Sequence, residues 1–305
     1  GVVKYTGTGG DQIGTVAVAI NEAGQLDFNG ATDTIAGVTI VSTGATGDTT
    51  PITNTVGGGA LTIGALSITP LTGYNTAIDT GTGTLALTNT VTFNPSGNGT
   101  AQISGNLDLG AATRTFAVND GDAFEDLVVD AVISGGANAG ITKTGTGRLV
   151  LSSANTYTGP TSVAGSLTVE NDTALGTTDA GTAVTGGASL ELRGGITVTG
   201  ETLSLYGLGV ATSGALRNLS GDNTWDGDVT LAAAARINSD AGTLTIPAGN
   251  TISSAGATYA LTVGGAGNVS ILGDLDVAGL LKDGTGELRL AGSNLRTGPT
   301  TVTAG

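Results

Sequence analysis

Apolar residues in this chain recur at every second position within short segments. In these segments Leu, Ile or Val stands at the first and third positions, most often with Thr, Ser or a charged residue between them. The segments are 61–63, 85–87, 107–109, 149–151, 167–169, 190–192, 203–205, 244–246, 261–263, 275–277 and 288–290. This alternation places the apolar side chains on one face of a strand. Because Thr and Val branch at Cβ, they favour a pleated backbone. The pattern predicts an all-β chain of many short strands.

Glycine-rich breaks separate these segments, at 57–59, 135–136, 186–187 and 264–265. Gly permits the positive φ of sharp corners. The best candidate for a helix is the segment 122–132, but its pairs Val128-Val129 and Val132-Ile133 favour a strand, and we predict a strand there.

Three architectures fit many short strands: a sandwich, a barrel or propeller, and a solenoid. Sandwiches and propellers normally hold a few large aromatic core residues, whereas this chain is 3% aromatic. A solenoid needs only a narrow core of stacked Leu, Ile, Val and Ala, and it grows along one axis. A single compact core of 305 residues would strain the usual domain limit. We therefore predict one elongated β-solenoid over residues 1–305.

An internal repeat supports this prediction. Residues 143–163 read KTGTGRLVLSSANTYTGPTSV and residues 282–302 read KDGTGELRLAGSNLRTGPTTV, with 12 of 21 positions identical at an offset of 139 (282 − 143). A partial copy lies at 220–230, where SGDNTWDG matches the stretch at 153–159.

The repeat predicts two corners around a short strand. Gly-Thr-Gly makes the first corner, Leu-x-Leu follows, and Asn with a later Gly marks the second corner. Asn can adopt a left-handed backbone or bond a neighbouring coil through its amide, so these asparagines are either members of a polar ladder or ordinary turn residues. The predicted structural corner residues are Gly145, Gly147, Asn155, Gly159, Asn223, Gly284, Gly286, Asn294 and Gly298.

The motif resembles the autotransporter-associated β-strand repeat family, whose pattern G-T-G-x-L-x-L-x-G-x-N-T-Y-x-G-x-T-x-V-x-x-G-x-L is followed almost throughout by 145–167. The resemblance implies a right-handed parallel β-helix displayed outside a bacterial cell, and it carries no catalytic residues. In the last copy Leu295 and Arg296 replace Thr-Tyr, and the copy stops at Ala304-Gly305. We expect a longer parent chain, or an end that continues by pairing with another molecule.

Composition excludes several functions. The chain has no Cys, His or Met, which removes the usual zinc, haem and iron–sulfur ligands, a Cys nucleophile and any Ser-His-Asp triad. A net charge of −15 argues against nucleic acid, which binds through Lys and Arg. No apolar run reaches the ~18 residues of a membrane helix, so we expect no membrane insertion within this segment.

Acidic residues offer weak candidates for chemistry. Asp120, Asp122 and Asp126 are the candidate Ca²⁺ ligands, although their spacing matches no known calcium loop, and the alternative is a solvated turn. A glycosidase needs two carboxylates across a cleft, and alternation alone produces outward pairs such as Asp120 and Asp122. Tyr157 and Trp225 share one position of the repeat, which favours a role in the corner over a sugar platform. We expect no cofactor and no catalytic site.

The leading hypothesis is an extracellular structural protein, a solenoid subunit or segment of a bacterial surface fibre. Uncovered strand edges at a solenoid end invite another chain, and head-to-tail contacts yield open filaments. The expected partners are copies of the same chain stacked end to end. The alternative is a monomeric adhesin passenger that binds a glycan or surface. A polysaccharide-active β-helix enzyme ranks third.

Overall fold

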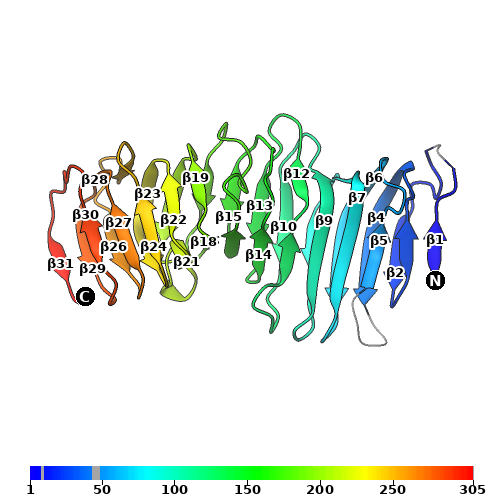
Figure 1. Ribbon diagram of the computed structural model, residues 1–305, viewed down its shortest axis with the longest axis horizontal. Coiled ribbons are helices and arrows are strands. Elements are labelled where there is room, and N and C mark those ends of the chain that lie inside the picture. The colour runs from blue at the N-terminus through cyan, green and yellow to red at the C-terminus, as the bar shows by residue number, and fades with distance from the viewer. Residues whose placement is uncertain (8–9, 43–48, 305) are drawn as a thin grey trace. The chain divides into compact units, whose positions relative to one another are not determined.

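The computed structural model describes residues 1–7, 10–42 and 49–304, so Gly305, where the last repeat copy stops, lies outside the described residues. Contacts divide the chain into two units, residues 1–159 (unit 1) and 160–305 (unit 2). Both are built from strands that succeed one another coil by coil (Figure 1). The described part of the chain holds no α-helix, and therefore no helix of the length and apolarity that would span a membrane.

The described residues of unit 1 form the first fourteen strands. They are β1 (Val2–Lys4), β2 (Ala17–Asn21), β3 (Gln25–Asp27), β4 (Thr32–Ser42), β5 (Thr49–Thr53), β6 (Ala60–Pro70), β7 (Asn75–Leu87), β8 (Val91–Phe93), β9 (Thr100–Asp108), β10 (Arg114–Val118), β11 (Leu127–Val129), β12 (Val132–Ser134), β13 (Ile141–Thr144) and β14 (Arg148–Leu151).

These strands pair in parallel and form three faces. The first face runs β2–β4–β6–β8–β10–β13. The second joins the early halves of β4 and β6 to the late halves of β7 and β9 and then to β12. The third runs β1–β3–β5–β7–β9–β11–β14. Each coil contributes one strand segment to a face, as in a parallel solenoid.

Like residues stack on like residues inside unit 1. Ile40, Ile68, Phe93 and Val118 occupy one register position of successive strands, and all four are buried. Such columns bury apolar area in every coil, so the core needs few large side chains.

The described residues of unit 2 (160–304) contain the remaining strands and one 3₁₀ turn, η1 (Val210–Thr212). The strands are β15 (Thr161–Val163), β16 (Ser166–Val169), β17 (Thr182–Val184), β18 (Ser189–Arg193), β19 (Thr197–Thr199), β20 (Leu203–Gly207), β21 (Leu216–Ser220), β22 (Asn223–Asp226), β23 (Val229–Ser239), β24 (Thr243–Ile246), β25 (Thr251–Ser253), β26 (Ala260–Gly264), β27 (Asn268–Ile271), β28 (Asp274–Asp276), β29 (Gly279–Lys282), β30 (Leu288–Leu290) and β31 (Thr300–Val302).

Unit 2 also has three parallel faces. One runs β15–β17–β20–β23–β25–β28, the second β16–β18–β21–β23–β26–β29–β31, and the third β19–β22–β24–β27–β30. The all-β parallel solenoid predicted from the sequence is thus confirmed within each unit. That the two units form one elongated solenoid stays a prediction.

Every Leu-x-Leu segment identified in the sequence overlaps a strand. The strand predicted over 122–132 is wrong in its first half, because residues 122–126 contain no strand and the strands begin at Leu127 and Val132. The Asp126 carboxylate accepts a hydrogen bond from the backbone N–H of Gly121 over 2.8 Å, which folds this segment back into a loop.

Candidate functional site

The Gly-Thr-Gly corner of the first repeat copy lies between β13 and β14. Gly145 has φ +83°, and a Cβ there would overlap the carbonyl oxygen of Val118 in the preceding coil. A Cβ at Gly147 would lie 2.5 Å from the carbonyl oxygen of Asn119. The corner therefore uses glycine both for its backbone conformation and for the close approach of two coils.

The second copy repeats this arrangement between β29 and β30. Gly284 has φ +72°, and a Cβ there would lie 2.5 Å from backbone atoms of Gly265. A Cβ at Gly286 would overlap the carbonyl oxygen of Gly267. The two corners follow one geometric rule although they lie in different units.

The glycine of the second corner, which follows the repeat asparagine, also lies against the preceding coil. A Cβ at Gly159 would lie 2.6 Å from the carbonyl oxygen of Ala139, and a Cβ at Gly298 would overlap that of Ala278. In the partial copy, a Cβ at Gly227 would overlap the carbonyl oxygen of Glu201. Glycine at this repeat position sets how closely two coils can stack.

The repeat asparagines differ among the copies, and none of the three has a left-handed backbone. Asn155 Oδ1 accepts a hydrogen bond from the backbone N–H of Ile133 over 2.8 Å. Asn223 Oδ1 accepts two, from Gly195 over 2.8 Å and Ile196 over 2.7 Å. Asn294 is exposed and donates to the carbonyl of Gly292 within its own corner over 3.3 Å. Asn155 and Asn223 thus tie neighbouring coils together.

Two lysines of the repeat are buried, which the sequence analysis missed. Lys143 is fully buried, and its Nζ donates to the carbonyl oxygens of Thr144 and Gly145, each over 2.8 Å. Lys282 Nζ bonds Asp283 and Gly284 in the same way, over 2.7 and 2.9 Å. The ammonium group therefore gathers the carbonyl oxygens of the corner in both copies. Burial lowers the pKa of Lys143 to about 8, against the attraction of Asp126 and Asp120.

The signal for these lysines was present in the sequence. Lys143 follows Ile141 at i+2, and Lys282 follows Leu280 at i+2. Strict alternation places both lysines on the inward face.

The three candidate calcium ligands do not gather. Asp120 and Asp122 are exposed, whereas Asp126 is buried and accepts backbone N–H bonds from Gly121 over 2.8 Å and Arg148 over 2.7 Å. Burial raises the pKa of Asp126. Across residues 1–7, 10–42 and 49–304, no three acidic side chains come together as metal ligands. Asp126 serves to hold the loop 119–126 in place.

Tyr157 and Trp225 are both fully buried. Each takes the inward-facing place of its repeat copy, so neither offers a flat exposed surface to a sugar ring.

A ladder of polar residues crosses the strands of unit 2. Thr168, Glu191, Arg217 and Asn238 occupy one register position of β16, β18, β21 and β23. Thr168 Oγ1 donates to Glu191 over 2.8 Å, and Arg217 Nη1 donates to Glu191 over 3.1 Å. Glu191 is fully buried although alternation predicts that it faces outward, beside the inward-facing Leu190 and Leu192. Arg217 pairs with Glu191 over 3.1 Å and with Asp240 over 2.6 Å, so one guanidinium serves two carboxyl groups.

A second buried acid lies nearby in the sequence. Glu201 is 3% exposed, and its carboxylate accepts a hydrogen bond from Thr182 Oγ1 over 2.7 Å. Burial raises the pKa of Glu201 to about 7.

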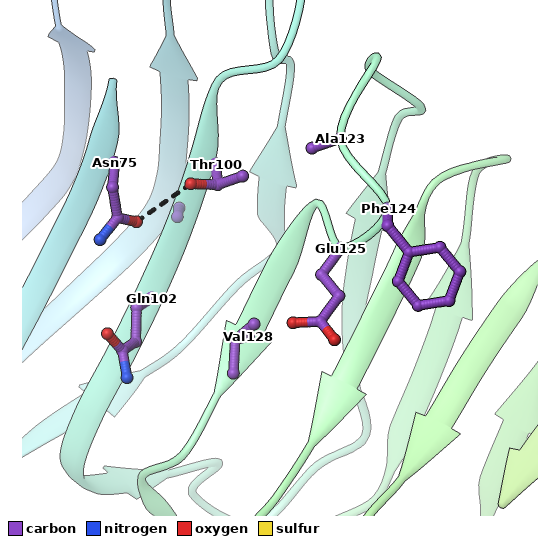
Figure 2. Close-up of a pocket in the computed structure, with 8 residues that line it drawn as sticks. Asn75, Thr100, Gln102, Ala123, Phe124, Glu125 and Val128 are labelled. Carbon is purple, nitrogen blue, oxygen red and sulfur yellow. Dashed lines mark hydrogen bonds between the residues drawn. The ribbon is translucent and has the colours of Figure 1, made fainter. Parts of the chain in front are cut away.

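Unit 1 carries an open groove of about 650 Å³ on its third face. It is lined by Asn75, Thr100, Ala101, Gln102, Ala123, Phe124, Glu125 and Val128. Figure 2 shows Asn75 and Gln102 on one side, Glu125 on the other, and Val128 between them. Strands β7, β9 and β11 form the base of this groove, and the loop 119–126 forms its second wall.

Comparisons with known proteins agree with the motif. The passenger-associated-transport-repeat model matches residues 141–169 and 280–305. The chain is 30% identical over 178 residues to the adhesin BmaC autotransporter of Brucella suis biovar 1 (strain 1330), a stretch covering 56% of this chain and 5% of that protein. No solved structure matches the chain. The two repeat copies match the passenger-associated-transport-repeat model, which confirms the resemblance to the autotransporter-associated family.

Proposed function

We propose that this chain is an extracellular segment of an autotransporter-type passenger and contributes to adhesion at a bacterial surface. One observation carries the proposal: the passenger-associated repeat supplies the corners of a parallel solenoid in both units. The chain spans 5% of the length of the adhesin that it resembles, so adhesion is carried over to this chain as a proposal.

A structural and adhesive role, without catalysis, fits the acidic side chains. Asp126 is bound to the backbone of its own loop and to Arg148, and Glu191 is paired with Arg217. Asp274 accepts a hydrogen bond from the backbone N–H of Ser293 over 2.8 Å. These carboxylates hold coils and corners together, a role that suits a solenoid without disulfides.

End-to-end stacking is a second candidate function. Val2 and Val3 of β1 are 61% and 57% exposed, and Val302 of β31 is 66% exposed. An exposed apolar edge strand favours pairing with a further strand, which is either the next coil of the same passenger or a strand of another copy. Electron microscopy of the isolated protein tests this: filaments with a meridional spacing near ~4.8 Å would support stacking, and isolated short particles would count against it.

The adhesion proposal is tested by an in-frame deletion of all 305 residues of this segment in the bacterium that produces the parent protein. We expect fewer bacteria to attach to a surface that the parent strain colonises, with the remainder of the passenger still present by immunoblot. Attachment equal to that of the parent strain would contradict the proposal.

A further inference from the structure

The groove of unit 1 is built on fixed side chains. Arg148 Nη1 donates to the carbonyl oxygen of Phe124 over 2.6 Å, and its guanidinium lies 4.0 Å from the centre of the Phe124 ring. The backbone N–H of Arg148 also donates to Asp126. Since β14 and the buried Asp126 hold the loop 119–126, the groove exists without a ligand and needs little reorganisation to bind one.

The polar atoms of the groove offer both donors and acceptors. Thr100 Oγ1 donates to Asn75 Oδ1 over 3.2 Å, and Gln102 Nε2 donates to Asp130 Oδ2 over 2.9 Å. Within the described chain, these bonds leave the Nδ2 of Asn75 as a donor and the Oε1 of Gln102 as an acceptor on the same side of the groove. A group that donates and accepts at once, such as a hydroxyl, matches this pair.

The charge of the groove limits the ligand further. Its lining contains no Lys or Arg, and it contains the carboxylate of Glu125. Asp120 and Asp122 are exposed on the loop that forms its wall. An anionic ligand would meet repulsion from these carboxylates, so the charge of the groove excludes an anionic ligand.

Apolar atoms complete the surface. Val128 lies between the two polar sides, and Phe124 is 61% exposed at the edge beyond Glu125 (Figure 2). Hydroxyl groups that alternate with apolar C–H faces are the chemistry of a sugar chain. Concave sites with an apolar base and a few placed polar groups are typical of small-ligand sites.

We propose that this groove binds a neutral oligosaccharide, with Asn75 and Gln102 bonding its hydroxyls and Val128 contacting its apolar face. The inference rests on the proposed function, because it gives the adhesive segment a ligand class and a site.

The test applies the full chain to a printed array of neutral, sialylated and sulfated glycans, followed by titration with the neutral oligosaccharide that gives the strongest signal. Val128→Trp fills the groove and should abolish binding. Asn75→Ala combined with Gln102→Ala should weaken binding about tenfold or more, since two hydrogen bonds are lost. Thr92→Trp is the matched control, because Thr92 also points outward from mid-sheet, on the first face of unit 1, and it should bind as wild type does.

Circular dichroism establishes that the variants are folded. Three results would overturn the proposal. The chain binds no neutral glycan on the array, it binds only sialylated or sulfated glycans, or the folded Val128→Trp variant binds the neutral oligosaccharide as tightly as wild type does. A strain carrying Val128→Trp separates this inference from the proposed function. If that strain attaches like its parent while the deletion strain does not, the groove assignment fails and the adhesive function stands.

Discussion

The substitution Gly159→Ala tests how coils stack at the repeat corner. The new Cβ would lie 2.6 Å from the carbonyl carbon and oxygen of Ala139 and 2.6 Å from the carbonyl oxygen of Asn138. All three atoms are backbone, so the preceding coil must move. The Gly159 N–H also donates to Ala139 over 2.6 Å, and that hydrogen bond would lengthen. Overpacking costs about 1–3 kcal/mol and a weakened hydrogen bond about 1 kcal/mol, so we expect a loss of about 3 kcal/mol in the free energy of unfolding.

Gly136→Ala is the matched control in the preceding coil. Its Cβ would meet no backbone or side-chain atom closer than 3.5 Å, and its φ is not positive. Replacing such a glycine changes stability by about 0.4–1 kcal/mol in the favourable direction, because the unfolded chain loses freedom.

Guanidinium denaturation followed by circular dichroism measures both variants. Solenoids lose two-state behaviour when one region opens before another, so amide exchange around residues 138–141 should accompany it. We expect faster exchange there in Gly159→Ala and no change in Gly136→Ala. Free energies of unfolding within about 0.5 kcal/mol of each other would refute this account of the corner.

Three further predictions concern buried polar groups. Asn223→Ala leaves the N–H groups of Gly195 and Ile196 without their acceptor and should cost about 2–4 kcal/mol, whereas Asn294→Ala should cost under about 0.5 kcal/mol; equal melting shifts would contradict this. Glu201 has a folded pKa of about 7, above its ordinary value, so its contribution is complete below pH 4.5 and is lost as the pH rises through 7. Between pH 4.5 and pH 7 the free energy of unfolding of wild type, measured by guanidinium titration, should fall by about 3 kcal/mol relative to that of Glu201→Gln. A difference between the two proteins that does not change with pH would disprove the burial argument. Lys143 has a folded pKa of about 8, below its ordinary 10.5, so the unfolded chain binds more protons between these values and stability rises with pH. Between pH 8 and pH 10.5 the free energy of unfolding of wild type should rise by about 3 kcal/mol relative to that of Lys143→Met. A difference that falls with pH would exclude a buried ammonium.

Alternation and the repeat predicted the strands and the solenoid, and the resemblance to the autotransporter-associated family implied that the strands run parallel. Alternation alone predicts that pairs such as Leu61 and Ile63 face the core, and both are buried. The repeat glycines were also predictable, because Gly145 and Gly284 stand at the same place in two copies. These features depend on residues a few positions apart, which a sequence displays directly.

The remaining features depend on neighbouring coils. Glu191 has the outward position of a solvated residue, yet Thr168 and Arg217, 23 and 26 residues away, bury it and bond it. The groove joins Asn75 to Glu125 across two coils, and part of its wall, residues 122–126, was predicted as a strand. Such contacts are set by coil register, which loop lengths determine and local patterns do not specify.

Labelling of intact bacteria tests the central claim most directly. Antibodies raised against the 305-residue chain would be applied to the producing bacterium before and after treatment with an external protease. The account predicts labelling of unpermeabilised cells that the protease removes, while a periplasmic marker stays unlabelled and intact. Labelling that appears only after permeabilisation and survives the protease would contradict an extracellular passenger.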